Sequence, residues 1–173
     1  MISLSGLFDL LMILFVIIVV LRGLAKEILV SFSGILALFI IELILPKVIT
    51  ETSSQKLATY QLLTIGGVAF LGYQTPNIRR LVETGRFQRG SFKNMILGGL
   101  VGGINGYLLL GSAWYFIAEA GYPFSQITAP DAATEAGQAA AQILKVVAPN
   151  FLQPPYIYYA LAIGSMLLIG VFL

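Results

Sequence analysis

The residue types that most enzymes use for catalysis are largely missing from this chain. None of its 173 residues is cysteine or histidine, which excludes disulfides, thiolate chemistry, imidazole bases and histidine-ligated haem or chlorophyll. The chain also lacks a Walker A loop, an H-E-x-x-H motif and a G-x-S-x-G nucleophile elbow. A serine–lysine dyad would need a lysine within an apolar segment, and there is none. The sequence predicts a protein that is not an enzyme and has no metal site or ligated cofactor, although a bound lipid or carotenoid would leave no motif.

The remaining candidates for function are polar residues within apolar surroundings. Glu27, Ser31, Gly34 and Glu42 share one face of a helix at 100° per residue. A second stripe consists of Tyr60, Thr64, Gly67 and Gln74, and further candidates are Asp9, Arg22, Asn105, Ser112 and Glu119. Because lipid cannot satisfy polar groups, we expect these residues to face a bundle interior or a water-filled path. The carboxylates fall near the ends of their segments, so the sequence shows no relay across the centre of the kind a proton-coupled pump needs.

Five glycines lie close together in one apolar segment. Gly98, Gly102 and Gly106 repeat every four residues, and Gly99 and Gly103 form a second row beside them. Such rows allow helix backbones to approach closely, and close packing is a main attraction between helices in lipid. The pattern predicts a helix–helix contact. It leaves open whether the contact lies within one chain or between copies, as in an oligomeric pore lined by this helix.

The elements that must position these residues are apolar helices. Hydrophobic residues make up 58% of the chain and charged residues 10%, and the mean hydropathy is +0.90. In soluble domains, about 45–50% of the residues are apolar and about 25% are charged. A helix that spans a bilayer needs roughly 20 mostly apolar residues. Five segments meet this need: 1–21, 28–45, 57–75, 95–117 and 156–173. Asp9 and Glu42 are the only charged residues in them, which predicts an all-α polytopic membrane protein with about five transmembrane helices.

The basic residues in the connections predict the orientation. The first and third connections together carry seven lysines and arginines, and the second and fourth carry three. The positive-inside rule then places the N-terminus outside and the C-terminus in the cytoplasm. The third connection contributes Arg79, Arg80, Arg86, Arg89 and Lys93. This patch either contacts anionic lipid headgroups or acts only as the topology signal, and it is too short to predict nucleic-acid binding.

The fourth connection, 118–155, is long enough to contain a short helix outside the membrane. Thr128 and Asp131 have the spacing of a capping box, with Pro130 in the first turn, and Pro149 is expected to end the helix. The prediction is an external amphipathic helix over 131–148. Such a helix either lies at the membrane interface or docks a partner, or it packs onto the ends of the spans.

Two blocks of sequence resemble the CvpA family of colicin V production proteins. The first consists of Asp9 and the run Arg22-Gly23-Leu24-Ala25-Lys26-Glu27, which matches the family's R-G-x-x-[RK]-E at the start of its second span. The second runs from Leu97-Gly98 to Gly106 after a basic connection, and the tail 136–152, a short helix broken by proline, is also similar. The resemblance covers 1–152 as a CvpA-like membrane domain and leaves 153–173 as an additional C-terminal transmembrane helix.

The resemblance implies a small bacterial inner-membrane protein in export, transport or envelope homeostasis, without an appended protease domain. Two departures remove charge from the fourth segment: Asn94-Met95-Ile96 stand where the family often has Asp-Arg before Leu-Gly, and Asn105 stands where a basic residue often precedes the last glycine. The alternative is an accessory subunit of a larger membrane complex, respiratory or photosynthetic. The expected partners are membrane lipids and one of two kinds of protein. These are further copies of this chain, held by the two rows of glycines as a glycine zipper, or other integral membrane subunits.

Overall fold

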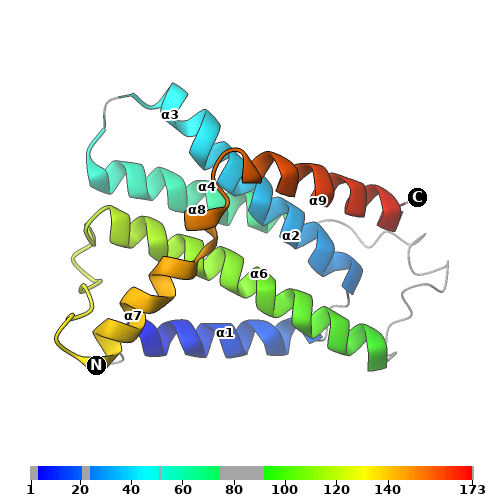
Figure 1. Cartoon of the computed structure of the whole chain (residues 1–173), viewed down its shortest axis with the longest axis horizontal. Coiled ribbons are helices and arrows are strands. Elements are labelled where there is room, and N and C mark those ends of the chain that lie inside the picture. The colour runs from blue at the N-terminus through cyan, green and yellow to red at the C-terminus, as the bar shows by residue number, and fades with distance from the viewer. Residues whose placement is uncertain (1–3, 21–23, 51, 75–91, 173) are drawn as a thin grey trace.

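The computed structural model describes residues 4–20, 24–50, 52–74 and 92–172, and this part of the chain contains helices and no strand. The prediction of an all-α fold is confirmed. The long helices are α1 (Leu4–Val20), α2 (Leu24–Phe39), α4 (Ser54–Gln74), α6 (Phe92–Glu119) and α9 (Tyr156–Phe172). Each covers most of one apolar segment of the sequence. The first turn of α1 and the last turn of α9 lie at opposite ends of the bundle (Figure 1).

The helix that begins with α2 continues beyond the predicted end at residue 45. It passes through a π-helical turn, η1 (Ile40–Ile44), into the short helix α3 (Leu45–Val48), which has Pro46 in its first turn. Proline has no N–H to donate, and its ring crowds the carbonyl four residues earlier in a regular helix. A wider π turn before the proline relieves that crowding, so the helical run extends to Val48.

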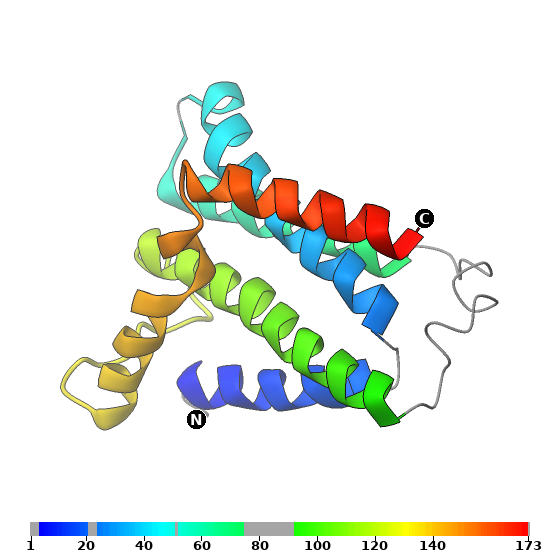
Figure 2. The same cartoon turned by 45° about the vertical axis from the view of Figure 1, so that its right-hand side comes forward.

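α2 occupies the centre of the bundle. It packs against α4, α6 and α9, whereas α1 packs mainly against α6. Figures 1 and 2 show α1 along one edge beside α6, with α9 along the opposite edge. The central core consists of Ala37, Leu38, Ile41, Ile65, Leu108, Phe116, Ala148 and Ile157. These residues belong to α2 and η1 and to the helices packed around them, and none belongs to α1. The position of α1 therefore depends on its contact with α6.

The predicted stripe on the third segment does not face the bundle. Tyr60, Gly67 and Gln74 are exposed, and the buried residues of α4 are instead Ala58, Ile65, Ala69 and Gly72. A Cβ on Gly72 would collide with the Ser33 hydroxyl of α2. Small side chains let α4 approach α2 closely, and this packing outweighs the weak polarity of the other face.

The helix predicted over 131–148 is shorter than expected and has a different cap. α7 runs from Glu135 to Val146, and Thr134, not Thr128, caps it by accepting a hydrogen bond from the Gly137 N–H at 3.1 Å. A Cβ on Gly137 would collide with the backbone carbonyl of Asp131, so the turn before α7 folds directly over its first residues. The predicted capping box was therefore wrong because this turn supplies a nearer hydroxyl.

The predicted role of Pro149 as the end of this helix was also wrong. The helix ends because Val147 is extended, and Pro149 lies in the first turn of the next helix, α8 (Ala148–Phe151). Proline suits a first turn, where its missing N–H has no partner to lose. The break therefore belongs to Val147, whose side chain is fully buried.

α7 packs onto the ends of α1 and α6. Ala140 is buried with Phe8 of α1 and Trp114 of α6, whose rings lie 5.3 Å apart between centroids. Val147, which follows α7, contacts the face of α6 at Gly111. Of the arrangements considered for this helix, packing onto the long helices is the one observed.

The glycine rows of α6 contact α1 within the same chain. A Cβ on Gly102 would collide with Val19, and one on Gly106 would lie 3.1 Å from the Phe15 ring and 3.2 Å from Met12 Sδ. Gly103 faces Val16 more loosely, at 3.5 Å. Gly98 is buried and Gly99 half-buried. The glycines let α1, which lies outside the central core, pack closely against the bundle.

Within the part of the chain that the structure describes, two helical stretches are long and apolar enough to cross a membrane. They are Lys26–Val48 and Ile96–Glu119. Leu4–Val19 and Tyr156–Gly170 are also apolar helices but are shorter. The two longest apolar stretches are thus the central helix and the helix that joins it to α1.

We expect Gly102→Ala to lower the thermal stability of the protein. The added methyl would force α1 away from α6, and overpacking of this kind costs about 1–3 kcal/mol. The matched control is Gly67→Ala on α4, where a Cβ meets nothing within 4 Å. Alanine is favoured over glycine within a helix by about 0.8–1.0 kcal/mol, so the control should unfold at the parent's temperature or above. Equal unfolding midpoints for Gly102→Ala and the parent, measured by circular dichroism, would contradict the close contact.

Candidate functional site

Three polar side chains form a hydrogen-bonded cluster between α2 and α6. Glu27 and Asn105 are fully buried, with no exposed surface. The Asn105 Nδ2 group donates to Glu27 Oε2 at 3.0 Å and to the Glu27 backbone carbonyl at 2.8 Å. The Ser31 hydroxyl lies 2.6 Å from Asn105 Oδ1, to which it donates, and 3.0 Å from the Glu27 carbonyl. We refer to Glu27, Ser31 and Asn105 as the polar cluster.

The donors and acceptors of the polar cluster fit together in only one orientation of the amide. Asn105 Nδ2 faces two acceptors, and its Oδ1 faces a hydroxyl donor. Reversing the amide would place Oδ1 against the carboxylate and carbonyl oxygens of Glu27, which repel it. The amide therefore bridges a carboxyl group and a hydroxyl group on α2 from a single position on α6.

The sequence places these groups by simple helical spacing. Glu27 and Ser31 are four residues apart and so lie on one face of α2. Glu27 is in the first turn, where free N–H groups and the helix dipole favour a carboxylate. One turn further along, Gly34 leaves room for Leu108, which follows Asn105 by three residues. Three members of the predicted stripe on α2 therefore face α6.

The other predicted carboxylates do not join the polar cluster. Glu42 lies in η1, about 22 Å from Glu27 along the helix at 1.5 Å per residue. Glu42 lies close enough to Glu119, at the end of α6, for their negative charges to repel each other, and Tyr115 lies within reach of both charges. Asp9 is exposed on α1. The structure therefore keeps Glu42, Glu119 and Asp9 apart from the polar cluster.

For several predicted residues the structure describes no side chain. Arg22, Arg79, Arg80, Arg86 and Arg89 fall outside the described residues, and only the backbone of Lys93 is described, in α6. Across the described ranges, no three histidine, cysteine or acidic residues come together as a group that could hold a metal ion.

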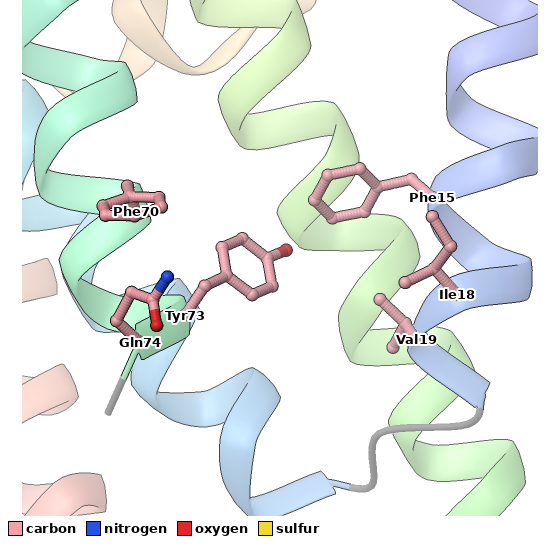
Figure 3. Close-up of a pocket in the computed structure, with 6 residues that line it drawn as sticks. All are labelled: Phe15, Ile18, Val19, Phe70, Tyr73 and Gln74. Atoms are coloured by element: carbon pink, nitrogen blue, oxygen red, sulfur yellow. The ribbon is translucent and has the colours of Figure 1, made fainter. Parts of the chain in front are cut away.

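A groove between α1 and α4 is the feature that sequence reasoning missed. Its volume is about 380 Å³, and it is lined by Phe15, Ile18, Val19, Phe70, Tyr73 and Gln74. Figure 3 shows the side chains of α1 and α4 facing each other across it, with α6 behind. Most of these residues are apolar and come from segments about 50 residues apart in the chain, so no sequence pattern marks them as a set. We call this feature the α1–α4 groove.

Comparison of the chain with protein-family models, with curated proteins and with solved structures gives no match. The resemblance to the CvpA family therefore rests on the sequence motifs alone.

We expect Asn105→Leu to destabilise the protein. The substitution removes the bridging amide and leaves the Ser31 hydroxyl and the Glu27 carboxyl without its hydrogen bonds, and such a loss costs about 1–3 kcal/mol for a buried group. The control is Ser112→Ala, because Ser112 is equally buried on α6 but donates only to the Leu108 carbonyl of its own helix. If Asn105→Leu unfolds at the temperature of the control, the polar cluster does not hold α2 and α6 together.

Proposed function

We propose that this chain is a small polytopic protein of the bacterial inner membrane. Its role would be CvpA-like, in export, transport or envelope homeostasis, and without catalysis. Its N-terminus would lie outside and its C-terminus in the cytoplasm. The proposal joins the packing of the bundle with the family resemblance of Asp9 and the run from Arg22 to Glu27.

The observation that carries the membrane proposal is an inverted distribution of polarity. Glu27 and Asn105 are completely buried, whereas large apolar side chains are more than half exposed on every side of the bundle. Examples are Ile13 on α1, Leu71 on α4, Leu100 on α6 and Met166 on α9. Soluble monomers rarely expose large apolar patches. Hydrocarbon around the bundle would make both halves of the distribution favourable.

The tyrosines at the start of α9 support a membrane boundary at the level of that helix end. Tyr156 and Tyr159 are mostly exposed, and Tyr158 packs its ring on Phe39 with 6.3 Å between the centroids. Amphipathic rings favour the level of the lipid headgroups. The start of α9 is also the end of the bundle that carries α7.

The chemistry of the polar cluster supports a role without catalysis. A serine nucleophile needs a neighbouring base to accept its proton. The Ser31 hydroxyl instead donates to the amide oxygen of Asn105, which is not a base. Glu27 and Asn105 have no exposed surface, so a substrate has no access to either side chain. Its geometry suits a clamp between two helices.

The family proposal gains support from the place of its motif. Glu27, the last residue of the R-G-L-A-K-E run, is the buried carboxyl group that α2 presents to α6. The glycines of the second motif lie on α6 and pack against α1. Both motifs therefore form contacts of α6, the first with α2 and the second with α1, which gives a reason for them to occur in the same chain.

We expect the purified chain to stay dispersed only when detergent or lipid is present. Removing the amphiphile would expose the apolar surfaces of α1, α4, α6 and α9 to water and cause aggregation. Size-exclusion chromatography with and without detergent measures this. A chain that remains monodisperse in plain buffer would overturn the membrane proposal. Native mass spectrometry of the gently extracted protein then separates a CvpA-like chain or homo-oligomer from an accessory subunit, which would carry other subunits in fixed ratio.

A reporter fused after Leu173 is expected to indicate a cytoplasmic C-terminus. Five passes with an external N-terminus follow from the excess of basic residues in the first and third connections. A reporter that is active only in the cytoplasm, paired with one that is active only outside, gives a positive signal for either answer. An external C-terminus would contradict the five-span topology while leaving the membrane location intact.

A further inference from the structure

We propose that the α1–α4 groove binds one acyl chain of a glycerophospholipid. The inference rests on the proposed membrane location and adds a specific ligand class and site. It follows from the groove's position between two helices, from the chemistry of its walls and from its size.

The groove exists because α1 and α4 both pack on α6 from different sides. α1 is held against the glycine face of α6, with Val19 at Gly102 and Phe15 at Gly106. α4 contacts α6 and α2. The space left between α1 and α4 has α6 behind it (Figure 3) and is partly open to the surroundings. In a bilayer such an opening faces the hydrocarbon.

The walls are mostly apolar and carry a polar group at one end. Phe15, Ile18, Val19 and Phe70 supply hydrocarbon surface, the Tyr73 ring reaches across toward α1 (Figure 3), and an exposed amide comes from Gln74, the last residue of α4. The helices α1 and α4 both end on this side, so the amide lies where the proposed membrane ends. A phospholipid has the same order of polarity, with an acyl chain inward and ester and phosphate oxygens at the boundary. The Gln74 amide can donate a hydrogen bond to those oxygens.

The size of the groove excludes a helix as occupant. Its volume of about 380 Å³ lies at the lower end of the range of small-ligand sites, roughly 300–1,000 Å³, and an α-helix with side chains is about 10–12 Å wide. The rings of Phe15 and Tyr73 are in contact across the groove, with their centroids 6.1 Å apart, so an occupant lies beside this pair of rings. A single hydrocarbon chain is thin enough for that space.

A chain in the groove gains more contact than a lipid on the outer surface. Facing side chains from α1 and α4 surround it on two sides, and each well-packed pair of carbon atoms adds a small dispersion attraction. A lipid beside a convex helix face contacts the protein on one side only. A lipid in the groove should therefore exchange more slowly than the surrounding lipids and survive gentle extraction.

The test counts phospholipids that remain bound after extraction. The full chain is reconstituted in vesicles of phosphatidylethanolamine and phosphatidylglycerol, extracted in mild detergent and examined by native mass spectrometry. The parent is expected to retain one phospholipid per chain. Ile18→Trp fills the groove and should lose it, whereas Ile17→Trp, at a neighbouring exposed isoleucine that does not line the groove, should retain it.

A second pair of variants covers the case in which a tryptophan in α1 prevents folding. Phe70→Ala removes one wall of the groove and should also lose the lipid, whereas Leu71→Ala changes the next exposed residue of α4 outside the groove and should not. Thermal unfolding shows which variants fold.

Equal lipid retention by the groove variants and their controls would overturn the proposed site. A parent chain that retains no lipid would also overturn it. So would the finding that a molecule of another class, or a second copy of the chain, occupies this position. A chain that needs detergent but binds no lipid overturns only the groove, and the proposed membrane location would stand.

Discussion

The hydrogen bonds of Asn105 are the interaction on which the rest of the bundle depends. This single side chain on α6 joins the carboxyl group, a backbone carbonyl and a hydroxyl group of α2. A buried amide has few ways to satisfy all its donors and acceptors, so the cluster permits one register of α2 against α6. Because α2 also carries α4 and α9, and α6 carries α1 and α7, fixing this pair places every long helix of the bundle.

Glycines set the distances around the fixed pair. Gly34 on α2 accommodates Leu108 of α6, Gly102 on α6 accommodates Val19 of α1, and Gly164 on α9 lies against the Phe32 ring. Each contact pairs a missing side chain on one helix with a bulky one on its neighbour. In a bilayer, where lipid removes the hydrophobic driving force between helices, interdigitation of this kind would supply the dispersion contact that holds them together. The polar cluster thus selects the register, and the glycines provide most of the close packing.

The sequence was sufficient for the parts of this arrangement that have a period. Runs of apolar residues predicted the five long helices, and the spacing of Glu27, Ser31 and Gly34 predicted a common face, which turns toward α6. The face of α4 was predicted wrongly, because its weak polar stripe competed with small residues whose value appears only against Ser33 of α2. The groove could not be predicted, since hydrophobic residues give the same signal whether they face lipid, core or a gap. The cap of α7 was predicted wrongly for a local reason, because the turn before the helix brings Thr134 to the cap position.

The distribution of polar groups along α2 favours a framework over a conduction path. The polar cluster lies near one end, and Glu42 with Glu119 and Tyr115 lies near the other. Between them, α2 presents Ala37 and Leu38, which are fully buried in the central core. A proton or ion passing from one carboxyl group to the other would cross close-packed hydrocarbon, which does not open continuously. In the proposed membrane, the accessible surface is instead at the edge of the bundle, where the α1–α4 groove would meet lipid. On that proposal, the bundle would act by holding helices and lipids in fixed positions.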